Sequence, residues 1–207
     1  MSRRVRWFVV AVLVAVAAVG VMASRRTTPA QVADAAGQGA TSITVAADVP
    51  VLSDGPAPSI EANDGWLNTT PLTDADLAGK VVLYDFWTFG CINCQHTLPH
   101  VTAWQQRYAA DGLVILSIHT PEFDYEADAG NVAEFVAGAG IEYPVALDPD
   151  RDVWHAWDNH YWPAFYLYDG EGRLRVQHFG EGAYDSTEDA IRALLGVDPD
   201  SPRAVVR

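Results

Sequence analysis

The stretch DFWTFGCINCQHTLP, residues 85–99, decides the fold, and it holds both cysteines of this 207-residue chain, Cys91 and Cys94. Residues 81–87, which overlap the start of this stretch, are apolar on both faces, and this predicts a buried central strand. From Cys91 to about residue 110, apolar side chains recur near helical spacing, although Pro99 lies inside that run. The first cysteine therefore stands where a strand turns into a helix.

This position favours redox chemistry at the two sulfurs. Unpaired N–H groups and the helix dipole favour a thiolate at a helix N-terminus, and the thiolate is the reactive form of cysteine. Cys91 is the predicted nucleophile, and Cys94, one turn further in, is placed to close a disulfide with it. We expect no cofactor besides this redox-active disulfide.

Other uses of the cysteine pair fit less well. An inert disulfide across so short a loop would stabilise the fold little, because it removes little chain entropy. A metal site would need His96 and His100 as further ligands, and the stretch lacks a second well-spaced pair. A c-type haem site needs a histidine directly after the second cysteine, where Gln95 stands instead.

The ends of the chain are expected to lie outside the folded domain. Residues 1–23 combine three arginines with an apolar run, the pattern of an export signal or an N-terminal membrane anchor. We favour the uncleaved anchor, while cleavage after Ala23 stays open. Residues 24–58 are predicted to be a flexible linker, 59–197 one domain and 198–207 a tail. Both N-terminal readings place the domain outside the cytoplasm, either at the membrane or secreted.

The charge is unevenly distributed along the chain. Five of the 13 basic residues precede Thr27, whereas all 27 acidic residues follow it, so the remainder carries a formal charge of −19. Nucleic-acid binding is excluded by this balance, because phosphates would be repelled.

Helices alternate with strands through most of the domain. A short strand and turn are predicted at 66–72, strands at 113–118 and 143–147, and helices near 73–77, 130–140 and 151–157. Asn131 is expected to cap the second of these helices. A hairpin of 164–168 and 174–179 follows, and then a helix capped by Ser186 and closed by Gly196. This order predicts an α/β fold, a mixed central sheet with helices on both faces.

Several of these positions together resemble the thioredoxin fold over roughly residues 65–195. Within that fold the chain is most similar to the TlpA-like, membrane-tethered thiol–disulfide oxidoreductases, and especially to the C-terminal redoxin domain of DipZ-type proteins. Asp85, six residues before Cys91, matches a buried carboxylate, and Trp162-Pro163 matches a cis-proline pair. Residues 140–148 match the TlpA-type insertion. The Ile92-Asn93 dipeptide departs from thioredoxin's Gly-Pro and leaves the redox potential open.

The resemblance implies roles for the site residues. Asp85 is expected beneath Cys94, where a carboxyl in apolar surroundings would take its proton during resolution. Pro163 is expected in the cis form, leaving the backbone of Trp162 free to pair with a substrate peptide. The partners implied are protein thiols and disulfides, with a membrane electron donor as a further candidate. The direction of electron flow stays open.

Two rival functions remain. A peroxiredoxin-type peroxidase would have a proline and a threonine before its cysteine; Thr88 has that spacing, but Tyr84 occupies the proline position. A non-catalytic binding module is disfavoured because both cysteines are present. We also consider an acid near the thiols, from Glu122 or Glu126, feasible.

Overall fold

Strand β2 (Val81–Trp87) is the centre of the sheet, and all seven of its residues are buried. The computed structural model describes residues 49–61 and 63–207. Within them β2 pairs in parallel with β3 (Leu113–His119) and antiparallel with β5 (Ala164–Tyr168). β4 (Val145–Leu147), β1 (Gly65–Leu67) and β6 (Leu174–Phe179) complete the order β1-β4-β3-β2-β5-β6.

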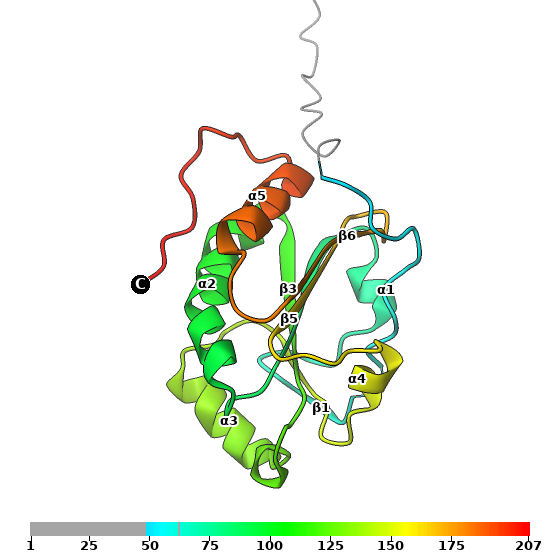
Figure 1. Ribbon diagram of the computed structural model, residues 1–207, viewed down its shortest axis with the longest axis vertical. Coiled ribbons are helices and arrows are strands. Elements are labelled where there is room, and N and C mark those ends of the chain that lie inside the picture. The colour runs from blue at the N-terminus through cyan, green and yellow to red at the C-terminus, as the bar shows by residue number, and fades with distance from the viewer. Residues whose placement is uncertain (1–48, 62) are drawn as a thin grey trace, which may run out of the picture. The chain divides into compact units, whose positions relative to one another are not determined.

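Helices cover both faces of this sheet (Figure 1). One face is covered by α2 (Ile92–Tyr108), α3 (Ala129–Gly138) and α5 (Tyr184–Leu195). The short helices α1 (Asp74–Leu77) and α4 (Asp152–Ala156) pack on the other. The predicted mixed sheet with two helical layers is confirmed.

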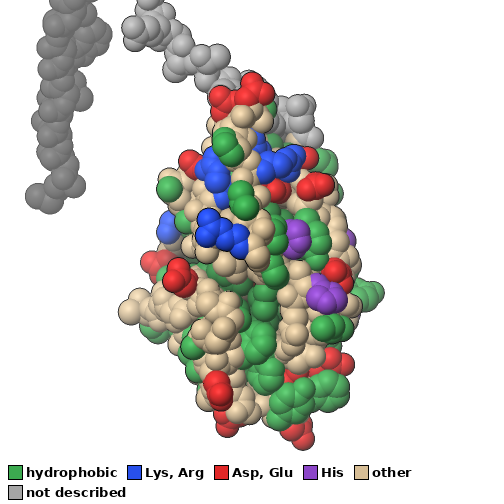
Figure 2. All heavy atoms as spheres, turned by 90° about the vertical axis from the view of Figure 1, so that its left-hand side faces the viewer, with side chains coloured by type: hydrophobic (Ala, Val, Ile, Leu, Met, Phe, Trp, Pro, Cys, Tyr) green, Lys and Arg blue, Asp and Glu red, His purple; other side chains and the backbone are tan. Residues whose placement is uncertain are grey.

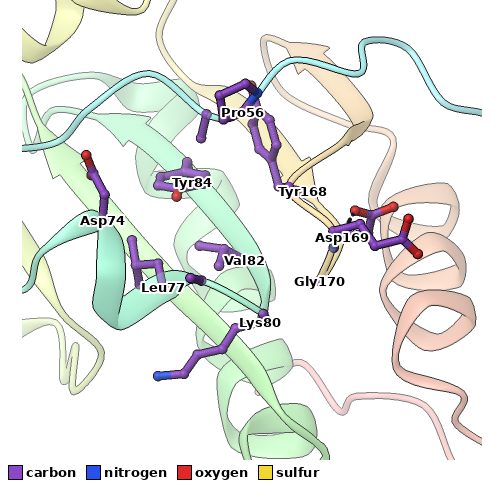
Figure 3. Close-up of a pocket in the computed structure, with 14 residues that line it drawn as sticks. Pro56, Asp74, Leu77, Lys80, Val82, Tyr84, Tyr168, Asp169 and Gly170 are labelled. Atoms are coloured by element: carbon purple, nitrogen blue, oxygen red, sulfur yellow. Dashed lines mark hydrogen bonds between the residues drawn. The ribbon is translucent and has the colours of Figure 1, made fainter. Parts of the chain in front are cut away.

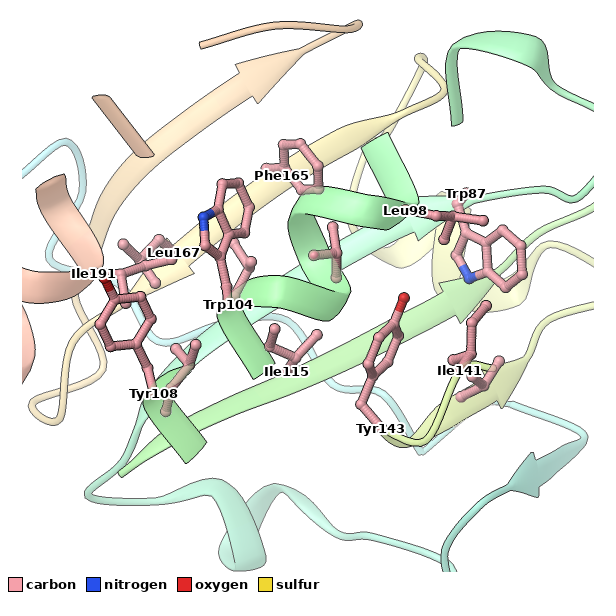
Figure 4. Packing of buried hydrophobic residues seen from close by; sticks show 14 of the residues in the cluster. Trp87, Leu98, Trp104, Tyr108, Ile115, Ile141, Tyr143, Phe165, Leu167 and Ile191 are labelled. Carbon is pink, nitrogen blue, oxygen red and sulfur yellow. The ribbon is translucent and has the colours of Figure 1, made fainter. Parts of the chain in front are cut away.

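The core on the α2 side is rich in large aromatic rings (Figure 4). Trp87 from β2, Trp104 and Tyr108 from α2, and Tyr143 before β4 are each almost fully buried. Their burial removes enough apolar surface from water to fix α2 against the sheet. The N-terminus of α2 is thereby held at the end of β2.

The folded part is longer than the sequence predicted. Residues 49–58 were expected to be linker, but Leu52 N–H donates to Leu174 O at 2.8 Å, and Arg175 donates to the carbonyls of Val49 and Pro50. The predicted tail is also held, because Arg192 donates to four carbonyls, those of residues 198, 199, 201 and 202. Two buried arginines thus donate hydrogen bonds to backbone carbonyls of both end segments. The composition of these segments alone gives no sign of these bonds.

Local boundaries differ as well. In the strand and turn predicted at 66–72, only the first two residues belong to β1, which begins one residue earlier, at Gly65. Asp128, not Asn131, caps α3, since its carboxylate accepts the Asn131 N–H at 3.0 Å. α5 begins at Tyr184 after Ala183, so Ser186 lies inside the helix and donates to Ala183 O.

The expected signal or anchor, residues 1–23, and residues 24–48 of the linker lie outside the described residues. Within 49–61 and 63–207, no helix is both long and apolar enough to cross a membrane.

Candidate active site

Cys91 occupies the N-cap of α2, as the sequence predicted. Its side chain is partly exposed, and its sulfur accepts the backbone N–H of Cys94 at 3.4 Å. Both cysteines are free thiols in this structure. A partly exposed sulfur at a helix N-terminus is accessible to a disulfide and faces unpaired backbone donors.

The loop before Cys91 is braced from both sides. Phe89 N–H donates to Nε2 of His119 at 3.2 Å, and Gln95 donates its side-chain amide to Phe89 O at 2.7 Å. Because Nε2 accepts this bond, His119 is neutral, and burial lowers the pKa of its ring to about 4. The Thr88 hydroxyl lies 3.4 Å from the same nitrogen. The sequence alone does not indicate a role for His119, because nothing in the chain order links it to residue 89.

Cys94 is buried and differs chemically from Cys91. It has no exposed surface, and burial strongly raises the pKa of its thiol, with its contact to Cys91 as the next cause. The negative charge of Asp85 is a further and smaller cause that raises this pKa. Cys94 therefore holds its proton at neutral pH and needs a base to become a nucleophile.

Asp85 is a fully buried carboxyl on β2. Ser117 of β3 donates its hydroxyl to Oδ2 at 2.9 Å, while Oδ1 has no hydrogen-bond partner among the described residues. Burial raises the pKa of Asp85 to about 7, against the smaller opposing effect of the Ser117 bond. Oδ1 is thus available to take up a proton near neutral pH.

The cis-proline lies at the start of β5. The Trp162–Pro163 peptide bond is cis, and Pro163 O accepts the Gly180 N–H at 2.8 Å. The Trp162 indole N–H donates to Thr120 O at 3.0 Å, and its ring stacks on Trp154 with centroids 4.1 Å apart. Trp162 and Cys91 both pack at the edge of the same core cluster.

Glu126 is a site feature that the sequence only hinted at. Its side chain is fully buried, and Oε2 accepts the N–H groups of Glu122 and Phe123 at 2.6 and 3.0 Å. Oε1 lies against the residue before Cys91, because a Cβ added to Gly90 would stand 2.0 Å from it. The loop after β3 is therefore closed by this carboxylate and fitted against the cysteine loop. Glu122, the other acid considered, is exposed.

The two histidines that a metal site at the cysteines would need, His96 and His100, contact other residues instead. His96 lies 3.1 Å from Glu181, and His100 stacks on Tyr184 with centroids 3.6 Å apart. In the described part of the chain no three His, Cys, Asp or Glu side chains are grouped to hold a metal ion.

A hollow of about 300 Å³ lies at the opposite end of β2 from the cysteines (Figure 3). Lys80 and Val82 of that end, together with Tyr168 and Gly170 of the β5–β6 hairpin, line it. It lies away from the thiols, and we assign it no part in their chemistry.

Comparison with known proteins shows the relatives of this chain. A model of the AhpC/TSA family matches residues 53–177. DipZ of Mycobacterium bovis is 48% identical over 144 residues, which make up 68% of this chain and 21% of DipZ, so the chain spans about a fifth of that relative. The thiol-disulfide oxidoreductase YkuV of Bacillus subtilis is 31% identical over 140 residues, 68% of this chain and 94% of YkuV.

A solved structure also resembles this chain. The solution structure of a thioredoxin-like protein in its oxidised form matches with a TM-score of 0.62 and 30% identity. The match covers 68% of this chain and 95% of that protein.

Proposed function

The chain belongs to the AhpC/TSA family and has a thioredoxin-like fold, and we propose that it is a thiol–disulfide oxidoreductase acting on proteins. The carrying observation is the asymmetry of the cysteine pair: Cys91 is partly exposed at a helix N-cap, and Cys94 is buried one turn behind it. One sulfur is accessible to a substrate, and the other reaches only its neighbour. The activity named for YkuV supports the same reading.

The reaction proceeds in two exchanges. The Cys91 thiolate attacks one sulfur of a substrate disulfide, so that the substrate S–S bond breaks and a mixed disulfide forms. The departing substrate sulfur takes up a proton. Asp85 then accepts the proton of Cys94, whose sulfur attacks Cys91 and releases the second substrate thiol. Two electrons pass to the substrate, leaving a Cys91–Cys94 disulfide and no need of a further cofactor. The reverse sequence oxidises a dithiol.

Trp162 and Pro163 are the proposed substrate-binding residues. An extended peptide pairs with backbone groups of a strand edge or strand start, and Pro163 directly precedes β5. Trp162 and Cys91 both border the same core cluster, and we place the substrate peptide along this backbone with its sulfur toward the nucleophile.

The cellular site is also part of the proposal. The basic and apolar pattern of residues 1–23 supports an N-terminal anchor that holds the domain on the extracytoplasmic face of the membrane. A membrane protein then serves as electron donor. Protease treatment of intact cells tests this: degradation of the domain supports it, and full protection contradicts it.

Peroxidase activity is the second candidate, because Thr88 precedes Cys91 at the spacing such sites use. The Thr88 hydroxyl lies beside His119 instead, and Tyr84 is buried in the core of the opposite sheet face. We therefore rank thiol–disulfide exchange first.

Reduction of insulin disulfides by dithiothreitol tests the proposal. The wild-type protein should accelerate it, and Cys91→Ser should not. A wild-type rate equal to the uncatalysed one contradicts the proposal. Peroxide consumption by Cys94→Ser, without acceleration by the wild type, would establish the peroxidase instead.

A further inference from the structure

A hollow of about 390 Å³ lies beside the cysteine loop, and the exchange reaction does not use it. Three aromatic residues line it: Phe89 of the cysteine loop, Tyr125 of the loop after β3, and Phe135 of α3. The Phe89 ring stacks on both Phe135 and His119 with centroids 5.5 Å apart, and it meets Tyr125 edge-on at 5.7 Å. The ring faces offered to a ligand are therefore chiefly those of Tyr125 and Phe135. Asn131 and Glu134 of α3 complete the lining.

The hollow is built on fixed supports. The brace from His119 and Gln95 fixes the backbone of Phe89, and Asn131 donates its side-chain amide to Tyr125 O at 2.8 Å. The buried Glu126 carboxylate closes the turn that carries Tyr125. Three rings are therefore held in place around an open space, although Tyr125 is 54% exposed.

The surroundings of the hollow are acidic. Glu134 is exposed, and no lysine, arginine or histidine pairs with its carboxylate among the residues that the structure describes. Asp124 and Asp128 are exposed on the neighbouring turn. On the face that α2 and α3 present, Lys and Arg side chains gather in the upper half, and none is visible at the lower end (Figure 2). Arg151 is engaged elsewhere, over the Trp162 ring and on Glu122 O.

We propose that the hollow between Phe89, Tyr125 and Phe135 binds a lysine or arginine side chain of the substrate polypeptide, with Glu134 as its counter-charge. Aromatic faces attract a cation, and a carboxylate on the rim adds to that attraction. This inference rests on the proposed function and names its substrate class: disulfides flanked by basic residues.

The position of the hollow sets where the basic residue must lie. Phe89 stands two residues before Cys91, and an extended chain spans at most ~3.6 Å per residue. A basic side chain about two residues from the substrate cysteine therefore reaches the rings while its sulfur meets Cys91.

Two peptides test the inference. Each carries one cysteine in a mixed disulfide with 2-mercaptoethanol, and they differ only in having lysine or norleucine two residues to either side of it. The rate at which each oxidises the reduced protein is measured by stopped flow at low salt. We expect the lysine peptide to react about 5-fold faster, as a cation–π contact with a counter-charge implies.

Two variants separate the hollow from the general acidity of the protein. Glu134→Gln should at least halve the ratio of the two rates. Glu61→Gln, an exposed acid next to Ile60 of the core on the opposite sheet face, should keep the ratio.

Equal rates for the two peptides, or a ratio that Glu134→Gln leaves intact, overturn the inference. Bis(2-hydroxyethyl) disulfide, which has no side chain for the hollow, serves as the reference substrate. If the wild-type protein fails to react even with this compound, the proposed function itself is contradicted and the inference falls with it.

Discussion

Replacing Asp85 with asparagine should make stability less dependent on pH. Burial raises the pKa of this carboxyl from its ordinary 3.8 to about 7. Between these values the unfolded chain is ionised and the folded protein is protonated, so the folded state binds more protons and loses stability as pH rises. In the wild type, the stability that depends on a protonated Asp85 is fully present below about pH 4 and is lost above about pH 7.

The magnitude follows from the size of the shift. One pKa unit corresponds to ~1.4 kcal/mol, so the whole penalty amounts to about 4 kcal/mol. From pH 5 to pH 8 it grows by about 3 kcal/mol. Asparagine cannot ionise, and its oxygen can still accept the Ser117 hydroxyl that now binds Oδ2. The unfolding free energy of Asp85→Asn, minus that of the wild type, should therefore rise by about 3 kcal/mol over this range.

Urea unfolding of both reduced proteins at pH 5, 6, 7 and 8 measures this difference. Asp111→Asn, at an exposed acid at the far end of α2, is the control and should show no such rise. A difference for Asp85→Asn that stays constant within about 0.5 kcal/mol from pH 5 to pH 8 would refute the raised pKa and its role in proton transfer.

Asp85→Asn should also slow the attack of Cys94 on the mixed disulfide at neutral pH, and the wild-type rate of this attack should rise with pH through about 7. A rate that Asp85→Asn leaves unchanged in rapid-quench experiments would contradict the role of Asp85 as a base. Gly90→Ala puts a methyl group 2.0 Å from a buried carboxylate oxygen, so it should destabilise the fold by about 1–3 kcal/mol in urea unfolding. The control Gly138→Ala, whose methyl group meets no atom within 4 Å, should not destabilise it. Equal effects of the two substitutions would contradict the close contact between Gly90 and that oxygen. The pKa of His119 is lowered to about 4, so its neutral ring contributes stability that is lost as pH falls from 6.5 through 4, by about 3 kcal/mol. His119→Gln should thus lose less stability than the wild type on acidification, and an equal loss in the two proteins would contradict the burial of a neutral ring.

The parts of the site that are local in sequence were predictable. The apolar run of β2, the helix after it and the spacing of Cys91 and Cys94 are short-range patterns, so they place the nucleophile at a helix start without knowledge of the tertiary fold. Asp85 and Pro163 depended on family resemblance, because a buried acid and a cis bond leave no periodic signal.

The rest of the site depends on contacts between distant segments. His119 reaches Phe89 only because β3 pairs beside β2 in register, with Trp87 opposite His119. The fit of Glu126 against Gly90 likewise needs the loop after β3 to fold back onto the cysteine loop. The contacts of residues 49–58 and 198–207 could not be predicted for a similar reason. Arg175 and Arg192 donate hydrogen bonds to carbonyls of these segments, and nothing in the local composition indicates those bonds.

Trapping the covalent intermediate tests whether Cys91 attacks the substrate disulfide and Cys94 only resolves the mixed disulfide. A peptide disulfide is incubated with reduced Cys94→Ser and with reduced Cys91→Ser, and the products are located by mass spectrometry. We expect a stable peptide adduct on Cys91 in the first variant and none in the second. An adduct forming on the buried Cys94 of the second variant at a comparable rate would contradict it.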